Sequence, residues 1–286
     1  MNFLRLVIIG LAIVLGAESV AAACPTADQV DRFVKDWKSK APTGALAAGA
    51  GLDDAMCAQD LLVERLKPEL GKIVGYKAGL TSKALQERFG VNEPVRGQLL
   101  AGMLLRDGAT VPASFGARPL YEADLLLVVK DEGINSATTA EEALAHISAV
   151  RPFIELPDLA VKEGEPMNGI VLAATNVAAR YGVMGAEIPV NSTPDMVKAL
   201  ADMTVVMTDG SGAKLAEGKG NAVLGSPLNV AIWIARDMAA SGTRLKAGDL
   251  ISVGSFTPLT PPKAGQTVTA RYDGLPGNPQ VSVSFK

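Results

Sequence analysis

The chain has 286 residues, of which 48% are apolar and 20% charged, and this composition excludes a disordered, collagen-like or coiled-coil protein. Its formal net charge is −3, and no block of basic residues stands out, so we expect no nucleic-acid partner, because phosphate binding needs clustered Lys and Arg. A single histidine excludes a multi-histidine metal site. Acid–base or metal chemistry must therefore use carboxylates, lysines, hydroxyls and backbone groups.

Residues 1–23 have the pattern of a signal peptide. Arg5 precedes an apolar run over residues 6–15, and Ala21-Ala22-Ala23 offers an A-x-A cleavage site. Ten residues span about 15 Å as a helix, which is half of a bilayer core. We predict that this segment is removed and that the mature protein is periplasmic or secreted, with no stable membrane insertion after cleavage. A membrane anchor is the alternative.

The sequence contains two cysteines, Cys24 and Cys57. In an oxidising compartment they would form a disulfide that fixes the N-terminal segment. Two alternatives stay open: Cys57 is a small buried residue, or Cys24 is acylated as in a lipoprotein.

Residues 24–70 are predicted to form a helical N-terminal region. Thr26 can cap a helix that runs to about Lys40 and buries residues spaced along one face. The spacing of apolar residues predicts a second helix over 53–66. A strand over 72–80 then leads to Thr81-Ser82, which can cap a short helix through Phe89.

The strongest predicted strand covers residues 120–130, and its apolar second half is typical of a strand covered on both faces. Next, Thr139-x-x-Glu142 is a capping box that opens a predicted helix over 140–150, which Pro152 would end. Residues 153–156 are predicted to form another buried strand.

The last third of the chain alternates strands and one long helix. Ser226-Pro227 begins a predicted helix that ends at Ala240. Further strands are expected over 204–208, 250–254, 267–272 and 280–285. We see no linker or repeat, and therefore predict one mixed α+β domain over residues 71–286.

Three acidic residues lie in two apolar strands. Glu122 and Asp124 are at i and i+2, so both side chains leave the same face of one strand. Glu155 lies in an equally apolar strand. Three inward carboxylates without histidine suit Mg²⁺ or Mn²⁺. The alternative is that Glu122 and Asp124 face solvent, or pair with Arg118 and Lys130.

Several motifs follow one another along nearly the whole of the chain after residue 23. They are Gly75-Tyr76-Lys77-Ala78-Gly79-Leu80-Thr81-Ser82, Phe89 to Pro94, Tyr121 to Asp124, Pro152 to Glu155, Leu224 to Asn229, Trp233 to Arg236, and Ala247 to Pro258. Together and in this order they resemble the motifs of a known family, the 2-keto-4-pentenoate hydratases and 4-oxalocrotonate decarboxylases of the fumarylacetoacetase superfamily.

The resemblance implies a mixed β-roll or barrel of the fumarylacetoacetase C-terminal-domain type, with flanking helices. It also implies a divalent metal ion held by Glu122, Asp124 and Glu155, although Asp124 stands where the family usually has Glu. Lys77 takes the position of the lysine that transfers protons. The expected substrate is a small 2-oxo or 2-hydroxy-alkenoic acid such as 2-hydroxypenta-2,4-dienoate, in the catabolism of aromatic compounds, and we expect a homo-oligomer.

Four hydroxyl side chains are further candidates for substrate binding. Thr81 and Ser82 either place helix N–H groups opposite the substrate carboxylate or simply cap the helix. Ser255 and Thr257 either donate to the substrate or belong to an ordinary strand-end turn. The family's P-D-F-G, S-R, D-N and G-H-P segments are replaced here by Pro94-Val95-Arg96-Gly97, Leu159-Ala160, Thr175-Asn176 and Gly225-Ser226-Pro227.

These replacements keep two alternatives to a lyase open. One is another reaction of the superfamily, the hydrolysis of an acylpyruvate or the decarboxylation of a β-keto acid. The other is a secreted, non-catalytic protein that binds a 2-oxo acid.

Overall fold

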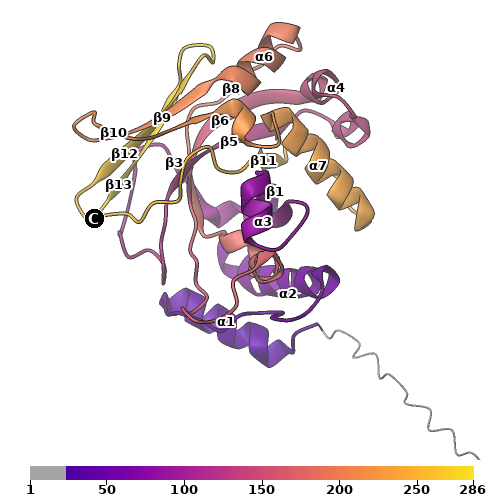
Figure 1. Ribbon diagram of the computed structural model, residues 1–286, viewed down its shortest axis with the longest axis vertical. Helices are drawn as coiled ribbons and strands as arrows, with labels where there is room; N and C mark the ends of the chain where they lie inside the picture. The colour runs from indigo at the N-terminus through magenta and orange to yellow at the C-terminus, as the bar shows by residue number, and fades with distance from the viewer. Residues whose placement is uncertain (1–23) are drawn as a thin grey trace, which may run out of the picture.

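The computed structural model describes residues 24–286, which form two β-sheets with helices around them (Figure 1). The helices are α1 (Ala27–Ser39), α2 (Leu52–Leu70), α3 (Lys83–Arg88), α4 (Ala140–Ala145), α5 (Gly169–Ala174), α6 (Pro194–Asp202) and α7 (Pro227–Ala240), with short 3-10 turns η1 (Ala101–Met103), η2 (Glu132–Ser136), η3 (Asn176–Ala178) and η4 (Gly220–Ala222). The predicted segment 1–23 lies outside the described residues.

The larger sheet has the strand order β2-β1-β11-β5-β6-β7-β3, and β8 pairs with β6. Its strands are β1 (Ile73–Gly79), β2 (Val95–Leu100), β3 (Leu104–Arg106), β5 (Glu122–Val129), β6 (Ile147–Leu156), β7 (Tyr181–Met184), β8 (Ile188–Pro189) and β11 (Leu250–Ser252). The β1–β11 and β3–β7 pairs are parallel, whereas β5 and β6 are antiparallel, so the sheet is mixed as predicted.

The smaller sheet has the order β10-β9-β12-β13-β4. Its strands are β4 (Ala109–Val111), β9 (Thr204–Asp209), β10 (Lys214–Lys219), β12 (Thr267–Asp273) and β13 (Gln280–Phe285). Tyr272 of β12 joins the two sheets: its hydroxyl accepts from the Phe153 N–H at 3.1 Å and contacts the carbonyl oxygen of Asp124. A continuous apolar core lies between the sheets and α7.

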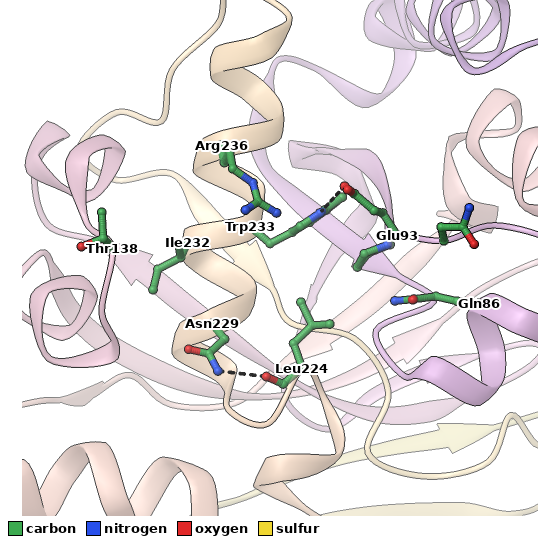
Figure 2. Close-up of a pocket in the computed structure, with 10 residues that line it drawn as sticks. Gln86, Glu93, Thr138, Leu224, Asn229, Ile232, Trp233 and Arg236 are labelled. Atoms are coloured by element: carbon green, nitrogen blue, oxygen red, sulfur yellow. Dashed lines mark hydrogen bonds between the residues drawn. The ribbon is translucent and has the colours of Figure 1, made fainter.

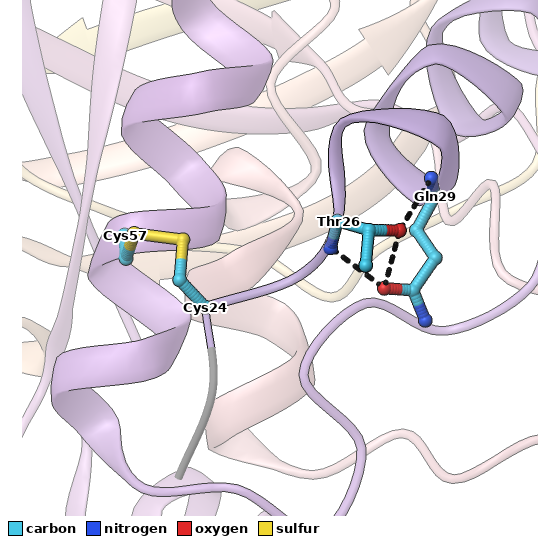
Figure 3. Close-up of a disulfide and its surroundings, with 4 residues drawn as sticks. All are labelled: Cys24, Thr26, Gln29 and Cys57. Atoms are coloured by element: carbon cyan, nitrogen blue, oxygen red, sulfur yellow. Dashed lines mark hydrogen bonds between the residues drawn. A yellow bond between two sulfur atoms is a disulfide. The ribbon is translucent and has the colours of Figure 1, made fainter.

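The N-terminal helices α1 and α2 pack at the end of the molecule opposite α4 and α6 (Figure 1). The apolar stripe predicted for α1 is buried and consists of Val30, Phe33, Val34 and Trp37. Thr26 and Gln29 form a capping box at its start. The predicted disulfide is present: Cys24 is bonded to Cys57 of α2, so the segment before α1 is fixed to the second helix (Figure 3).

The helix predicted over 140–150 is shorter than expected. Thr139 and Glu142 do form a capping box, but α4 ends at Ala145 and β6 begins at Ile147. Pro152 does not end a helix; it lies inside β6, between the residues that pair with β8 and those that pair with β7. A proline has no N–H to donate to a neighbouring strand. Pro152 lies between the two sets of paired residues, so no backbone donor is needed at its position.

Candidate active site

Two of the predicted acidic residues face each other across neighbouring strands. Glu122, the first residue of β5, is paired in register with Glu155 of β6. Their side chains are 8% and 3% exposed. Opposed side chains of antiparallel strands have Cβ atoms about 5 Å apart, and like charges placed there repel. Two buried carboxylates in this arrangement require a nearby positive charge.

Lys77 of β1 supplies one such charge. It is buried, its Nζ contacts Oε1 of Glu155 as an ion pair, and Nζ donates to the carbonyl oxygen of Val177 at 2.6 Å. Apart from this contact, no protein group donates a hydrogen bond to the buried Oε1 of Glu155. Burial raises the pKa of Glu122 well above its usual range and the charge of Glu155 raises it further, while Lys77 and the nearby Ser255 hydroxyl lower it.

Asp124 shares the face of β5 with Glu122, but protein groups already bind its carboxylate. Oδ1 accepts from the N–H groups of Val253 and Gly254 at 3.0 and 3.1 Å, and the Ser252 hydroxyl contacts Oδ2. Burial, and next the charge of Glu155, raise the pKa of Asp124 to about 8, although the Ser252 hydroxyl acts in the opposite direction. Asp124 therefore stabilises the turn that follows β11.

The four hydroxyl candidates divide into two groups. Thr81 and Ser255 line the same cavity as Lys77, Glu122 and Glu155. Ser82 instead caps α3 through a long hydrogen bond (3.4 Å) from the Leu85 N–H. Thr257 accepts from the Ala123 N–H at 3.0 Å and is buried within the sheet. The structure thus brings five predicted site residues to one cavity and places Asp124, Ser82 and Thr257 around it.

The remaining walls of this cavity are apolar. Leu80, Leu85 and Phe89 come from the end of β1 and from α3, and Leu159 and Leu172 come from the chain after β6. All five belong to the hydrophobic cluster that packs against α2. The cavity therefore has a charged end on the sheet and an apolar remainder.

The donor set fits a divalent cation. Glu122, Asp124 and Glu155 are all buried, and Lys77 is the one cationic side chain of the described residues that lines the cavity. Apart from its contact with Lys77, Oε1 of Glu155 is also a buried oxygen without a donor. Buried carboxylates in excess of cations are costly, and hard oxygen ligands are those that Mg²⁺ and Mn²⁺ prefer. As the side chains stand, no three acidic, histidine or cysteine residues in the described part of the chain are arranged as ready-made metal ligands.

The sequence reasoning missed the turn that holds Lys77. Residues Asn176, Val177 and Ala178 have consecutive positive φ angles of 56°, 51° and 55°. This conformation is rare for residues other than glycine, and for a β-branched residue above all, although Asn tolerates it best. The Asn176 side chain stabilises the turn: its Nδ2 donates to the Gln98 carbonyl at 2.9 Å and its Oδ1 accepts from the Gln98 N–H at 2.7 Å. The only signal in the sequence is the Asn itself.

A second pocket lies between α7 and the segment before β2, and Figure 2 shows its lining. Trp233 of α7 points toward Glu93, with Nε1 3.5 Å from Oε2, and Asn229 donates to the Leu224 carbonyl at 2.9 Å. None of the predicted site residues lines this pocket. The chemistry indicated by the sequence therefore belongs to the cavity at β1, β5 and β6.

Comparisons with known proteins identify similar chains. Residues 94–278 match the family model described as fumarylacetoacetate (FAA) hydrolase C-terminal. The 2-keto-4-pentenoate hydratase 1 of Dechloromonas aromatica is 31% identical over 84% of this chain and 89% of its own length. Two structures of 4-oxalocrotonate decarboxylase from Pseudomonas putida G7, one with calcium and acetate and one with magnesium and adipate, are 27% and 28% identical, with TM-scores of 0.78 and 0.77. Each covers 92% of this chain and 99% of the decarboxylase.

These matches confirm the predicted resemblance and the predicted fold class. They contradict the predicted periplasmic or secreted location, because the relatives are named as 2-keto-4-pentenoate hydratases and not as exported proteins. That expectation was wrong; it came only from the positive start, the apolar run and the small-residue site within residues 1–23. Among the described helices, none combines the length and the apolar character needed to span a bilayer.

Proposed function

We propose that this chain, which belongs to the fumarylacetoacetate hydrolase family, is a divalent-metal-dependent lyase of the hydratase or decarboxylase type. Its substrate would be a small 2-oxo or 2-hydroxy-alkenoic acid such as 2-hydroxypenta-2,4-dienoate. The observation that carries the proposal is that the Glu122–Glu155 pair and Lys77, which contacts Glu155, line one cavity whose other walls are apolar.

The carboxylates of Glu122 and Glu155, with that of Asp124 beside them, would hold Mg²⁺ or Mn²⁺. When bound, the ion supplies Lewis-acid stabilisation of negative charge on a substrate oxygen. Asp124 has one methylene fewer than a glutamate, and its bonds to Val253 and Gly254 position the turn that carries Ser255. Thr81 and Ser255 offer hydroxyl groups to the polar end of the substrate.

Lys77 would move the proton. Its Nζ is oriented by two acceptors, the Val177 carbonyl and the Glu155 carboxylate. Lys77 lines the same cavity as Glu122 and Glu155. A lysine in general acid–base catalysis needs a fixed position next to the reacting carbon. The apolar walls exclude water from that position.

Three further expectations, on the metabolic role, the oligomeric state and the domain division, also remain proposals. The names of the relatives support a role in the breakdown of products of aromatic-ring cleavage. A homo-oligomer is the second. A division of the chain into a helical region (24–70) and a catalytic domain (71–286) is the third, and α1 and α2 supply much of one apolar cluster.

The test is an assay of purified protein with 2-hydroxypenta-2,4-dienoate and Mg²⁺, which should bleach the dienol absorbance. Chelation with EDTA should abolish the activity and added Mg²⁺ should restore it. Lys77→Met should lower kcat by about 10² to 10⁴, because general acid–base catalysis contributes that much. It should leave Mg²⁺ binding, measured by calorimetry, no weaker, because no ligand is lost.

The matched control is Lys35→Met, the same change at an exposed position of α1. It should keep both kcat and Mg²⁺ affinity. Full activity in EDTA, or an unchanged kcat in Lys77→Met, would contradict the proposed mechanism.

A further inference from the structure

Gln59 connects α2 to the two segments that flank the active-site lysine. Its side chain is 0% exposed, and Nε2 donates to the Arg96 carbonyl of β2 and to the Ala173 carbonyl of α5, each at 2.7 Å. These acceptors lie 37 and 114 residues further along the chain. Burial of an amide is costly unless its polar atoms are bonded, so these two contacts fix how α2 packs against both segments.

Both acceptors are carbonyl groups that regular secondary structure leaves without a donor. β2 is an edge strand of the larger sheet, so alternate backbone groups of β2 point away from β1 and have no neighbouring strand. Ala173 lies in the last turn of α5, where a carbonyl lacks the usual N–H four residues further on. Gln59 donates to both carbonyls and thereby fixes the separation between β2 and the end of α5.

Lys77 lies where these two segments meet. In the pairing of β1 with β2, Lys77 is opposite Gly97, the residue that follows Arg96. A Cβ on Gly97 would lie 3.0 Å from Cγ of Lys77 and 2.9 Å from the Asn176 carbonyl oxygen, so β2, the lysine and the turn η3 are tightly packed. The Lys77 Nζ donates to the Val177 carbonyl of the same turn. A shift of β2 relative to α5 would therefore displace the acceptor of the lysine.

A second buried amide extends the same network. Gln98 of β2 is 6% exposed, and its Nε2 donates to Oδ1 of Asp60 at 2.9 Å and to Oε1 of Gln59 at 3.4 Å. The backbone N–H and carbonyl of Gln98 bond to the Asn176 side chain. A continuous series of hydrogen bonds thus connects α2, through β2, to the turn η3.

We propose that Gln59 is a positioning residue for Lys77: it holds β2 and the end of α5 at the separation that keeps the Val177 carbonyl within reach of the lysine. This inference rests on the proposed function, in which Lys77 moves the proton. Gln59 is not among the residues that line the cavity, so it acts through the backbone and not on the substrate. The helical region 24–70 then contributes to catalysis through α2, although every site residue lies after residue 70.

The kinetic test is Gln59→Met, because methionine has a similar length but no amide. Its kcat should fall about 10- to 100-fold, since displacing a catalytic group by about 1 Å can cost that much, while KM and Mg²⁺ affinity should change little. In the Lys77→Met background, Gln59→Met should have almost no further effect on kcat, because the group that it positions is absent. An equal fall in kcat in both backgrounds would overturn the proposal.

Leu62→Ala is the matched control for a loss of stability. Leu62 is buried in the same helix, and a leucine-to-alanine change in a core destabilises by leaving a cavity. This change removes no hydrogen bond to β2 or α5, so kcat should stay near the wild-type value. A fall in kcat as large as that of Gln59→Met would assign the effect to the stability of α2 and overturn the proposal. If Gln59→Met does not fold, Gln59→Asn replaces it with the same expected order, because its shorter amide can serve at most one carbonyl.

Chemical labelling of Lys77 separates a failure of this inference from a failure of the proposed function. Mass spectrometry of peptides can follow the reaction of each lysine with acetic anhydride. Lys77 should react slowly in the wild-type protein and in Leu62→Ala, because it is 3% exposed and bonded to Val177. In Gln59→Met it should react at least about tenfold faster, because local opening becomes easier, whereas the exposed Lys35 should react equally in all three proteins.

The two proposals then have different outcomes. Equal rates of Lys77 labelling in the wild-type protein and in Gln59→Met would overturn the positioning role and leave the lyase intact. The expected labelling rates without turnover of any substrate would overturn the lyase and keep the positioning role.

Discussion

At the scale of single residues, the sequence locates the charged centre but not the contacts that orient it. Glu122 and Glu155 could be identified because each is an acidic residue in an apolar strand, and such residues need a function or a partner. Lys77 was indicated by the resemblance to the family alone. The role of Asp124 could not be predicted in the same way. Its partners Val253 and Gly254 lie 129 and 130 residues further along the chain. The antiparallel pairing of β11 with β5 brings them there.

Gly254 shows the same dependence on distant contacts. Its φ is +95°, and a Cβ at this position would lie 2.6 Å from the Thr81 hydroxyl. A glycine is therefore required where the turn after β11 approaches the turn after β1. The motif around Gly254 indicated a turn, but the reason for the glycine is in the other segment.

Asn176 gives the prediction that belongs to this scale. Its amide pairs with the outer edge of β2 and so stabilises the left-handed turn whose Val177 carbonyl accepts from Lys77. Asn176→Ala should lower the free energy of unfolding by about 2–4 kcal/mol, because two buried backbone groups of Gln98 lose their partners. It should also lower kcat more than it changes KM, since Lys77 loses its fixed acceptor.

Asn176→Gly separates the two contributions of the side chain. Glycine adopts the positive φ without strain but makes no side-chain hydrogen bond. If the amide bonds are what matters, Asn176→Gly should be nearly as destabilised as Asn176→Ala in urea denaturation. A fully stable Asn176→Gly would mean that only the backbone conformation is important and would refute this account.

At the scale of elements, patterns with a local cause were predictable and patterns with a distant cause were not. The α1 stripe, the Thr139 capping box and the Ser226–Pro227 start of α7 each depend on residues within a few positions, and each is present. The error at β6 has the opposite origin. Residues 147–150 form a strand because β5 and β8 pair with them, and a short run of this kind fits a helix or a strand equally well.

The disulfide between Cys24 and Cys57 also acts at this scale, because it joins the start of α1 to α2 across a separation of 33 residues. Closing a loop of this length restricts the unfolded chain and stabilises the fold by about 3–4 kcal/mol. Reduction by dithiothreitol should therefore shift the urea midpoint of the protein downward. The double variant Cys24→Ser/Cys57→Ser should have this lower midpoint without dithiothreitol, and dithiothreitol should not change it. If the oxidised wild-type protein and the double variant have equal midpoints, packing alone holds α1 and α2 together.

At the scale of the whole molecule, one buried ion pair connects the N-terminal helices to the larger sheet. The Arg180 side chain donates to Asp158 Oδ2 and to the Trp37 carbonyl, both at 3.0 Å, and its guanidinium lies 4.2 Å from the centre of the Trp37 ring. Asp158 in turn accepts from the N–H groups of Ala117 and Arg118. The pair thus joins α1, the segment before β5 and the loop after β6, close in sequence to Glu155.

Removing one partner of such a pair leaves the other charge buried. Arg180→Met should therefore lower the free energy of unfolding by about 3–5 kcal/mol in urea denaturation. The double variant Arg180→Met/Asp158→Asn should lose less than the sum of the two single variants, because it leaves no unpaired charge. Arg271→Met is the matched control: its partner Asp273 is partly exposed, and loss of a surface ion pair of this kind costs at most about 1 kcal/mol. If Arg180→Met proves as mild as Arg271→Met, apolar packing of α1 and α2 alone, without the ion pair, connects the helical region to the sheet.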